Sequence, residues 1–225
     1  MGITTLQREK KTAPSDRKLR HNLLSLQLDP FMQMDPDFVL YVRPSVELDD
    51  DQLFEFCQIN RDFRIEQNEE GELIIMMPAG GTTSDRNSEI NMQLRQWTKR
   101  DGTGTAYESS IGFRLGKKEV LSPDAAWVRN DRLAQLTPEQ REKFPPLCPD
   151  FVIELKSRTD RLKTLQKKMQ VWIDRGVQLG WLIDPPAKRV YIYRPQQPVA
   201  TLEYPNSIAG DPILSGFVFD VTQIW

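Results

Sequence analysis

The chain is poor in the residues on which many hydrolytic enzymes depend. Its 225 residues include one histidine, His21, and two cysteines, Cys57 and Cys148, with no Cys-x-x-Cys pair. Catalytic triads, Cys–His pairs, histidine-rich zinc sites and HNH-type nuclease sites all need a well-placed histidine. A zinc knuckle or a dithiol redox site needs paired cysteines. Any hydrolytic chemistry must therefore rest on carboxylates and lysine, with or without a metal ion.

Long apolar runs are also missing. No uninterrupted run approaches the ~20 residues needed to span a bilayer, and the charged N-terminal stretch has no apolar segment typical of a signal peptide. We therefore expect a cytoplasmic protein with no membrane association. The net charge of −2 excludes a nucleic-acid coat protein with a uniformly basic surface, but it allows an enzyme with one local basic face.

The remaining sequence predicts one α/β domain behind an N-terminal extension. Residues 1–44 mix polar, charged and proline residues, and we assign residues 45–225 to the domain. Helical and strand-like patterns alternate along the domain, an order typical of a central sheet flanked by helices.

Capping residues and apolar periodicity predict the individual elements. A helix begins after Asp49, with Gln52 completing a capping box, and a hairpin turns at Gly71. Another helix is capped by Thr83 or Ser84. These and the further predicted helices cover 49–60, 83–97, 137–144 and 160–175, and the predicted strands cover 63–67, 72–77, 106–109, 111–115, 120–128, 149–156, 179–184 and 188–194.

Charged residues interrupt one otherwise apolar strand, "PDFVIELKS" at 149–157. Glu154 and Lys156 lie two residues apart, so they project from the same face, and Asp124 lies in another predicted strand. Charges in a central strand are costly unless they are paired or bind a ligand. Two carboxylates on neighbouring strands suit Mg²⁺, and the lysine can orient or help deprotonate water. A structural ion pair on a solvated sheet face is the alternative.

Two segments, "SPDAAWV" at 122–128 and "PDFVIELKS", resemble the PD-(D/E)XK nuclease superfamily and, within it, the Uma-type restriction endonuclease family. The resemblance covers roughly residues 45–195 and includes "PAGGTTSDRN", "KMQVWIDRGVQLGWLIDP" and "RVYIYR" in the family's order. It implies a restriction-endonuclease-like core with a central mixed β-sheet flanked by helices. It also implies an endonuclease that hydrolyses DNA phosphodiester bonds with Mg²⁺, or with Mn²⁺ in its place.

The resemblance further implies roles for single residues. Asp124 and Glu154 match the metal-binding acids, Lys156 matches the catalytic lysine, and the carbonyl of Leu155 is a further metal ligand. Superfamily members often add a glutamate from the helix that precedes these strands, which here is Glu89.

That helix offers two alternatives to Glu89. Asn87 lies nearer than Glu89 to the apolar face of the helix, and the glycine-rich loop of similar proteins often carries an acid, here Asp85.

The helix at 158–175 is basic and follows the predicted site. Its cations either form a solvated face of the helix or bind phosphate groups. Lys168 and Trp172 stand where some relatives carry a Gln-x-x-x-Tyr motif. The candidate nucleic-acid-binding residues are Arg161, Lys163, Lys167 and Lys168.

The expected partners are DNA and a second copy of the chain, because cutting both strands favours a homodimer. Two alternatives to a nuclease remain. One is an inactive nuclease scaffold that binds nucleic acid or a protein, and the other is a dimeric interaction protein whose sheet charges are structural.

Overall fold

The structure is a computed structural model of the chain, and it describes residues 39–42, 44 and 47–225. Most of the extension predicted for residues 1–44 lies outside the described residues. Its described part includes the strand β1 (Val39–Val42), which pairs with β3 (Leu73–Met76). In the described part of the chain, no helix is long and apolar enough to cross a membrane.

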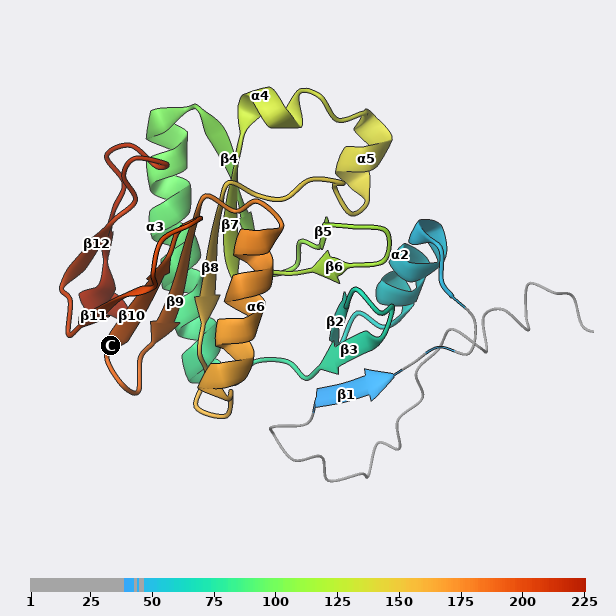
Figure 1. The fold of residues 1–225 in the computed structure, drawn as a ribbon, viewed down its shortest axis with the longest axis horizontal. Helices are drawn as coiled ribbons and strands as arrows, with labels where there is room; N and C mark the ends of the chain where they lie inside the picture. Colours follow the sequence, from blue (N-terminus) through green and yellow to red (C-terminus); the bar gives the residue numbers. More distant parts are fainter. Residues whose placement is uncertain (1–38, 43, 45–46) are drawn as a thin grey trace, which may run out of the picture.

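A six-stranded mixed sheet forms the larger part of the fold (Figure 1). Its strands run in the order β11–β10–β9–β8–β7–β4, and only β8 and β9 pair in parallel. The central strand β8 is buried at every position because helices cover both faces of the sheet. The strands are β4 (Gly104–Glu108), β7 (Ala125–Arg129), β8 (Phe151–Leu155), β9 (Leu179–Asp184), β10 (Arg189–Tyr193) and β11 (Ala200–Glu203).

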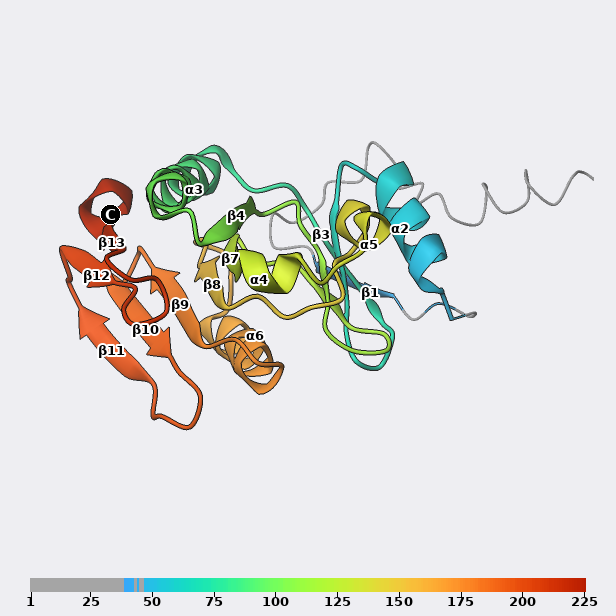
Figure 2. The ribbon, with the colours of Figure 1, turned by 90° about the horizontal axis from the view of Figure 1, so that it is seen from above.

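Two long helices lie on opposite faces of this sheet (Figure 2). The helix α3 (Gly81–Asp101) packs Ile90 and Leu94 on one face, together with the C-terminal β12 (Ser207–Ala209), β13 (Val218–Asp220) and η1 (Val221–Ile224). The helix α6 (Leu162–Asp174) packs Met169 and Trp172 on the other face. The prediction of a central mixed sheet flanked by helices is confirmed.

Five shorter strands form a second sheet beside the first (Figure 1). Their order is β1–β3–β2–β6–β5, and the helix α2 (Asp50–Ile59) packs on this sheet through Leu53 and Phe56. The new strands are β2 (Arg64–Gln67), β5 (Phe113–Arg114) and β6 (Val120–Leu121). Two short helices, α4 (Asn130–Leu133) and α5 (Pro138–Glu142), lie between β7 and β8 in the chain.

The predicted strand 120–128 is divided between the two sheets. Its first residues form β6 in the smaller sheet, and its last residues form β7 in the larger sheet. Pro123 lies at the break, and proline interrupts a strand because it has no N–H to donate. Ser122, Pro123 and Asp124 therefore form a direct link from one sheet to the other.

Candidate active site

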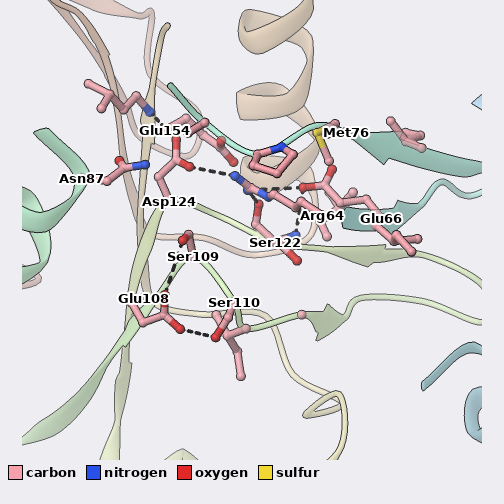
Figure 3. Close-up of a pocket in the computed structure, with 18 of the residues that line it drawn as sticks. Arg64, Glu66, Met76, Asn87, Glu108, Ser109, Ser110, Ser122, Asp124 and Glu154 are labelled. Carbon is pink, nitrogen blue, oxygen red and sulfur yellow. Dashed lines mark hydrogen bonds and ion pairs between the residues drawn. The ribbon is translucent and has the colours of Figure 1, made fainter. Parts of the chain in front are cut away.

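A cleft of about 2190 Å³ opens between the two sheets. Its lining includes residues of α2, β2 and β3 on the side of the smaller sheet, and residues of β4, the end of β8, α3 and α6 on the side of the larger sheet, with Asp124 just before β7. Figure 3 shows the side chains of Asp124 and Glu154 facing this space beside Arg64. The predicted acids therefore lie where side chains from four separate parts of the chain meet.

Asp124 and Glu154 stand on adjacent antiparallel strands. The backbone N–H of Asp124 donates to the carbonyl of Ile153 (3.0 Å), so Asp124 continues the ladder between β7 and β8. One carboxylate oxygen of Asp124, Oδ2, accepts a hydrogen bond from the Leu155 backbone N–H (2.7 Å). Both acids are buried, and both line the cleft. The structure thus brings the two sequence-predicted acids together on the same side of the sheet.

Glu154 is held firmly through one oxygen only. Its Oε1 accepts hydrogen bonds from Trp172 Nε1 (2.9 Å) and pairs with Lys168 Nζ (2.9 Å). No described residue donates a hydrogen bond to Oε2. Burial raises the pKa of Glu154 to about 7, although Lys168 lowers it, and the nearby Asp124 adds to the increase. An incoming cation would find Oε2 free and would favour the ionised carboxylate.

Lys156 is not brought to the two acids. The strand β8 ends at Leu155, and the Lys156 ammonium lies 3.8 Å from Asp184 Oδ1 at the end of β9. It also donates to the Ser157 carbonyl (3.1 Å). Among the described residues that line the cleft, the lysine nearest Glu154 is Lys168, which comes from α6. The catalytic role of Lys156 stays a prediction, whereas its expected position beside Asp124 and Glu154 is not observed.

Lys168 instead links the larger sheet to the smaller one. Its ammonium contacts Glu66 Oε1 (2.8 Å) on β2 as well as Glu154. Burial lowers the pKa of Lys168, but the carboxylates of Glu154 and Glu66 raise it overall, so the side chain stays a cation. Lys168 therefore bridges two buried carboxylates that come from different sheets.

Arg64 completes the group of charges. Its Nη1 lies 2.7 Å from Asp124 Oδ1, and its Nη2 lies 3.4 Å from Glu66 Oε1 and donates to the Ser122 carbonyl. We call Arg64, Glu66, Asp124, Glu154 and Lys168 the cleft-floor network.

Arg64 and Glu66 were not predicted as site residues, although their spacing in the sequence could have indicated it. They stand two residues apart in the predicted strand "FRIEQ", and this is the same spacing that drew attention to Glu154 and Lys156.

The helix α3 brings Asn87 to the cleft rather than Glu89. Glu89 Oε1 accepts a hydrogen bond from Gln93 Nε2 (2.8 Å), and neither Glu89 nor Asp85 lines the cleft. Asn87 lines it, and its buried Oδ1 has no hydrogen-bond partner. Figure 3 places Asn87 beside Asp124. The position of Glu89 therefore does not match the metal-binding role that the resemblance implied, and of the three candidates on this helix Asn87 alone lines the cleft.

The predicted nucleic-acid-binding residues divide into two pairs. Arg161 and Lys168 line the cleft, whereas Lys163 and Lys167 are exposed on α6 outside the cleft lining. The cleft walls carry further cations that sequence analysis did not assign to a site. Six arginines of the walls form no ion pair with a described carboxylate: Arg61, Arg86, Arg95, Arg141, Arg158 and Arg161.

Acidic residues also line the walls, but several of them are already engaged. Glu119 pairs with Arg175 (2.6 Å), Asp160 accepts from the Ser157 backbone N–H (2.7 Å), and Glu108 accepts from the neighbouring serine hydroxyls. Arg61, Arg95 and Arg141 donate to backbone carbonyls, but no carboxylate neutralises them. The wall arginines therefore offer uncompensated positive charge to an anionic ligand.

The site offers few protein ligands for a divalent cation. Within the described ranges, no group of three or more His, Cys, Asp and Glu side chains could hold a metal ion. Two carboxylates and a backbone carbonyl still suit Mg²⁺, which usually keeps several waters. The Leu155 N–H points to Asp124, and in a strand the carbonyl of the same residue points to the same neighbour. Asp124, Glu154 and the Leu155 carbonyl are thus the donors that fit.

A family model described as "Putative restriction endonuclease" matches residues 50–222, which include both acids and the whole cleft-floor network. The chain belongs to the Uma2 family. The crystal structure of a putative DUF820 nuclease from Anabaena variabilis has a similar fold, with a TM-score of 0.60 and 22% sequence identity. The match covers 71% of this chain and 88% of that chain. The search among curated proteins gave no match.

The Uma2 assignment confirms the family that the sequence resembled, and the Anabaena structure supports the fold. The general class of function, a nuclease, follows from the family.

Proposed function

We propose that this Uma2 protein is a divalent-metal-dependent endonuclease that hydrolyses DNA phosphodiester bonds in the cleft. One observation carries the proposal: Asp124 and Glu154 face a cleft whose walls present six arginines without carboxylate partners. Buried carboxylates suit a hard cation, and unpaired arginines suit phosphates. The same cleft therefore offers complementary sites for the metal and for the nucleic-acid backbone.

In this proposal, Asp124, Glu154 and the Leu155 carbonyl hold the cation, with Mg²⁺ as the expected ion and Mn²⁺ as a substitute. When bound, the ion polarises a phosphoryl oxygen as a Lewis acid and offsets the negative charge that develops there. Lys168 favours the ionised form of Glu154, because a cation at 2.9 Å stabilises the carboxylate. Trp172 fixes the orientation of Glu154 through its indole N–H.

A homodimer belongs to the same proposal. The proposed metal site in the described residues is formed by one pair of acids, Asp124 just before β7 and Glu154 near the end of β8. Cleavage of both strands of a duplex would then need two chains, and a twofold axis would match the antiparallel strands of DNA. Sedimentation of the protein with and without DNA would measure the number of chains directly.

A second candidate function has its own support. In the cleft-floor network, both acids are already paired with protein cations, Asp124 with Arg64 and Glu154 with Lys168. A scaffold that binds nucleic acid without cutting it needs no metal, because each of these two acids already has a protein cation beside it. Plasmid cleavage separates the two candidates.

The decisive measurement is nicking and linearisation of supercoiled plasmid in millimolar Mg²⁺ or Mn²⁺, with EDTA as the reference. We expect cleavage by the wild type and a loss of at least about 10²-fold in the Asp124→Asn variant, since one preorganised electrostatic group is typically worth about 10²–10³ in rate. Asp131→Asn is the matched control, because Asp131 pairs with Arg129 on the surface. DNA binding without cleavage by the wild type under all metal conditions would favour the scaffold.

A further inference from the structure

The cleft-floor network carries more negative than positive charge. Its carboxylates belong to Glu66, Asp124 and Glu154, and its cations belong to Arg64 and Lys168. When all five are ionised, three negative and two positive charges leave a net charge of −1. A phosphodiester would meet net repulsion at this floor. A divalent cation would change the sum to +1, and one phosphodiester would then bring it to zero.

The two protein cations differ in how completely they are bonded. Lys168 has three N–H donors, and they meet three acceptors: Glu66 Oε1 (2.8 Å), Glu154 Oε1 (2.9 Å) and the Ser122 carbonyl (2.8 Å). Arg64 has five N–H donors. Its Nε is buried and has no hydrogen-bond partner. Lys168 is therefore saturated, whereas Arg64 keeps donor capacity inside the site.

Arg64 is also the cation that a metal ion would displace. Its Nη1 lies 2.7 Å from Asp124 Oδ1, while the other oxygen of Asp124 is occupied by the Leu155 N–H. A divalent cation on Asp124 would compete with Arg64 for Oδ1, because two positive charges on one carboxylate oxygen repel each other. Release of Nη1 would free a charged donor at the metal site, while Nη2 stays bonded to Glu66 and the Ser122 carbonyl. A guanidinium N–H forms a strong, charge-assisted hydrogen bond to a phosphate oxygen.

We propose that Arg64 is the phosphate-binding residue of the cleft floor and that a divalent cation makes it available by taking its place on Asp124. This inference rests on the proposed function for the presence of a metal and a nucleic acid. It goes beyond that function because it assigns the residue that links the two ligands. Metal and DNA then strengthen each other's binding, and the coupling is reciprocal.

The test compares wild type, Arg64→Gln and the matched control Arg189→Gln. Arg189 pairs with one carboxylate, that of Glu203 (2.9 Å), and lies on β10 outside the cleft lining. Calorimetry measures Mn²⁺ affinity without DNA. Fluorescence anisotropy measures the affinity for a labelled oligonucleotide in Ca²⁺ and in EDTA at equal ionic strength, so that neither readout depends on cleavage.

We expect Ca²⁺ to strengthen oligonucleotide binding by about tenfold or more in the wild type and in Arg189→Gln, since a hydrogen bond to a charged group is worth at least about that factor. In Arg64→Gln this gain should fall severalfold, to what the charge of the ion alone supplies, while Mn²⁺ binds severalfold more tightly because its competitor is gone. A full Ca²⁺ gain in Arg64→Gln, weaker Mn²⁺ binding by that variant, or a wild type without any gain would each overturn the inference.

Two further measurements keep the outcome interpretable. Melting curves show whether Arg64→Gln is folded. If it is not, Arg64→Lys keeps the charge but loses the Nη2 contacts that hold the donor in place, and it should still lose most of the Ca²⁺ gain. Plasmid cleavage is scored separately. A wild type that shows the metal gain but never cuts contradicts the proposed function alone, whereas a wild type that cuts beside an Arg64→Gln variant with a full gain contradicts this inference alone.

Discussion

Charged side chains on the floor of the cleft are paired with one another, whereas the arginines on its walls are not paired with carboxylates. On the floor, each carboxylate is paired with a cation, as Glu154 is with Lys168 and Asp124 is with Arg64. On the walls, six arginines have no carboxylate partner among the described residues. Buried charges must be compensated for the chain to fold, whereas exposed cations remain open to a ligand. The difference fits our proposal, in which the floor residues serve the cleavage reaction and the wall arginines bind the nucleic-acid backbone.

The largest expected effect sharpens this comparison at the floor. Lys168→Ala should destabilise the protein by about 3–5 kcal/mol, because it leaves Glu154 buried without its cation partner and removes one of the two cations beside Glu66. It should also slow cleavage by about 10²-fold or more. Urea denaturation and plasmid cleavage on the same preparation measure both quantities.

Lys156→Ala is the partner experiment. Its ammonium lies 3.8 Å from Asp184 and outside the cleft lining, so we expect a loss of about 1–3 kcal/mol in stability and cleavage within a fewfold of the wild type. If Lys156→Ala instead abolished cleavage in a well-folded protein while Lys168→Ala still cut, the role that the family resemblance implied for Lys156 would stand and the role of Lys168 would not.

A smaller effect concerns the pH dependence of stability. Burial raises the pKa of Glu154 from its ordinary value of 4.5 to about 7, so the folded protein binds this proton more tightly than the unfolded chain does. Glu154 therefore contributes a penalty that grows as the pH rises from about 4.5 to about 7 and is constant above that range. Glu154→Gln should remove this penalty and flatten the stability curve between these pH values.

Urea unfolding of the wild type and Glu154→Gln at pH 5, 6, 7 and 8 measures that difference. Glu203→Gln, at an exposed position on β11, is the control and should leave the curve unchanged in shape. Parallel curves for wild type and Glu154→Gln would contradict the assignment of this titration to Glu154.

The smallest effect tests the walls. Arg161→Gln should weaken oligonucleotide binding severalfold and reduce the slope of log affinity against log salt by about 0.9, the value for one lost phosphate contact on duplex DNA. Lys167→Gln removes the same charge from an exposed position of the same helix outside the cleft lining. It should change both quantities little. Equal effects of the two variants would mean that the whole helix, rather than the cleft wall, meets DNA.

Local signals in the sequence were enough to predict many of the elements. The capping box of Asp49 and Gln52, the turn at Gly71 with its positive φ of 84° and the helix end at Gly176 are all observed. The start of α3 was predicted wrongly: Gly80 rather than Thr83 or Ser84 precedes it, and no side chain caps it. A run of small polar residues offers several equivalent caps, so local chemistry does not select one.

The site was predictable only where its residues share a local pattern. Asp124 and Glu154 could be placed on one face from strand alternation alone. Lys168 could not be placed, because its approach to Glu154 depends on how α6 crosses the sheet. That crossing brings Met169 within 2.4 Å of where a side chain at Gly180 would begin, so the glycine makes room for the helix. Glu66 could not be placed either, because its approach to Lys168 depends on the smaller sheet, whose strands come from distant parts of the sequence.

The link between the two sheets sets how the cleft can open. Only Ser122, Pro123 and Asp124 separate the end of β6 from the start of β7. A stretch this short spans at most about 14 Å even when it is fully extended. The sheets therefore cannot part at the floor, and any widening must be a pivot about this tether. Because Asp124 is itself part of the tether, the pivot of the cleft and the proposed metal site share this residue.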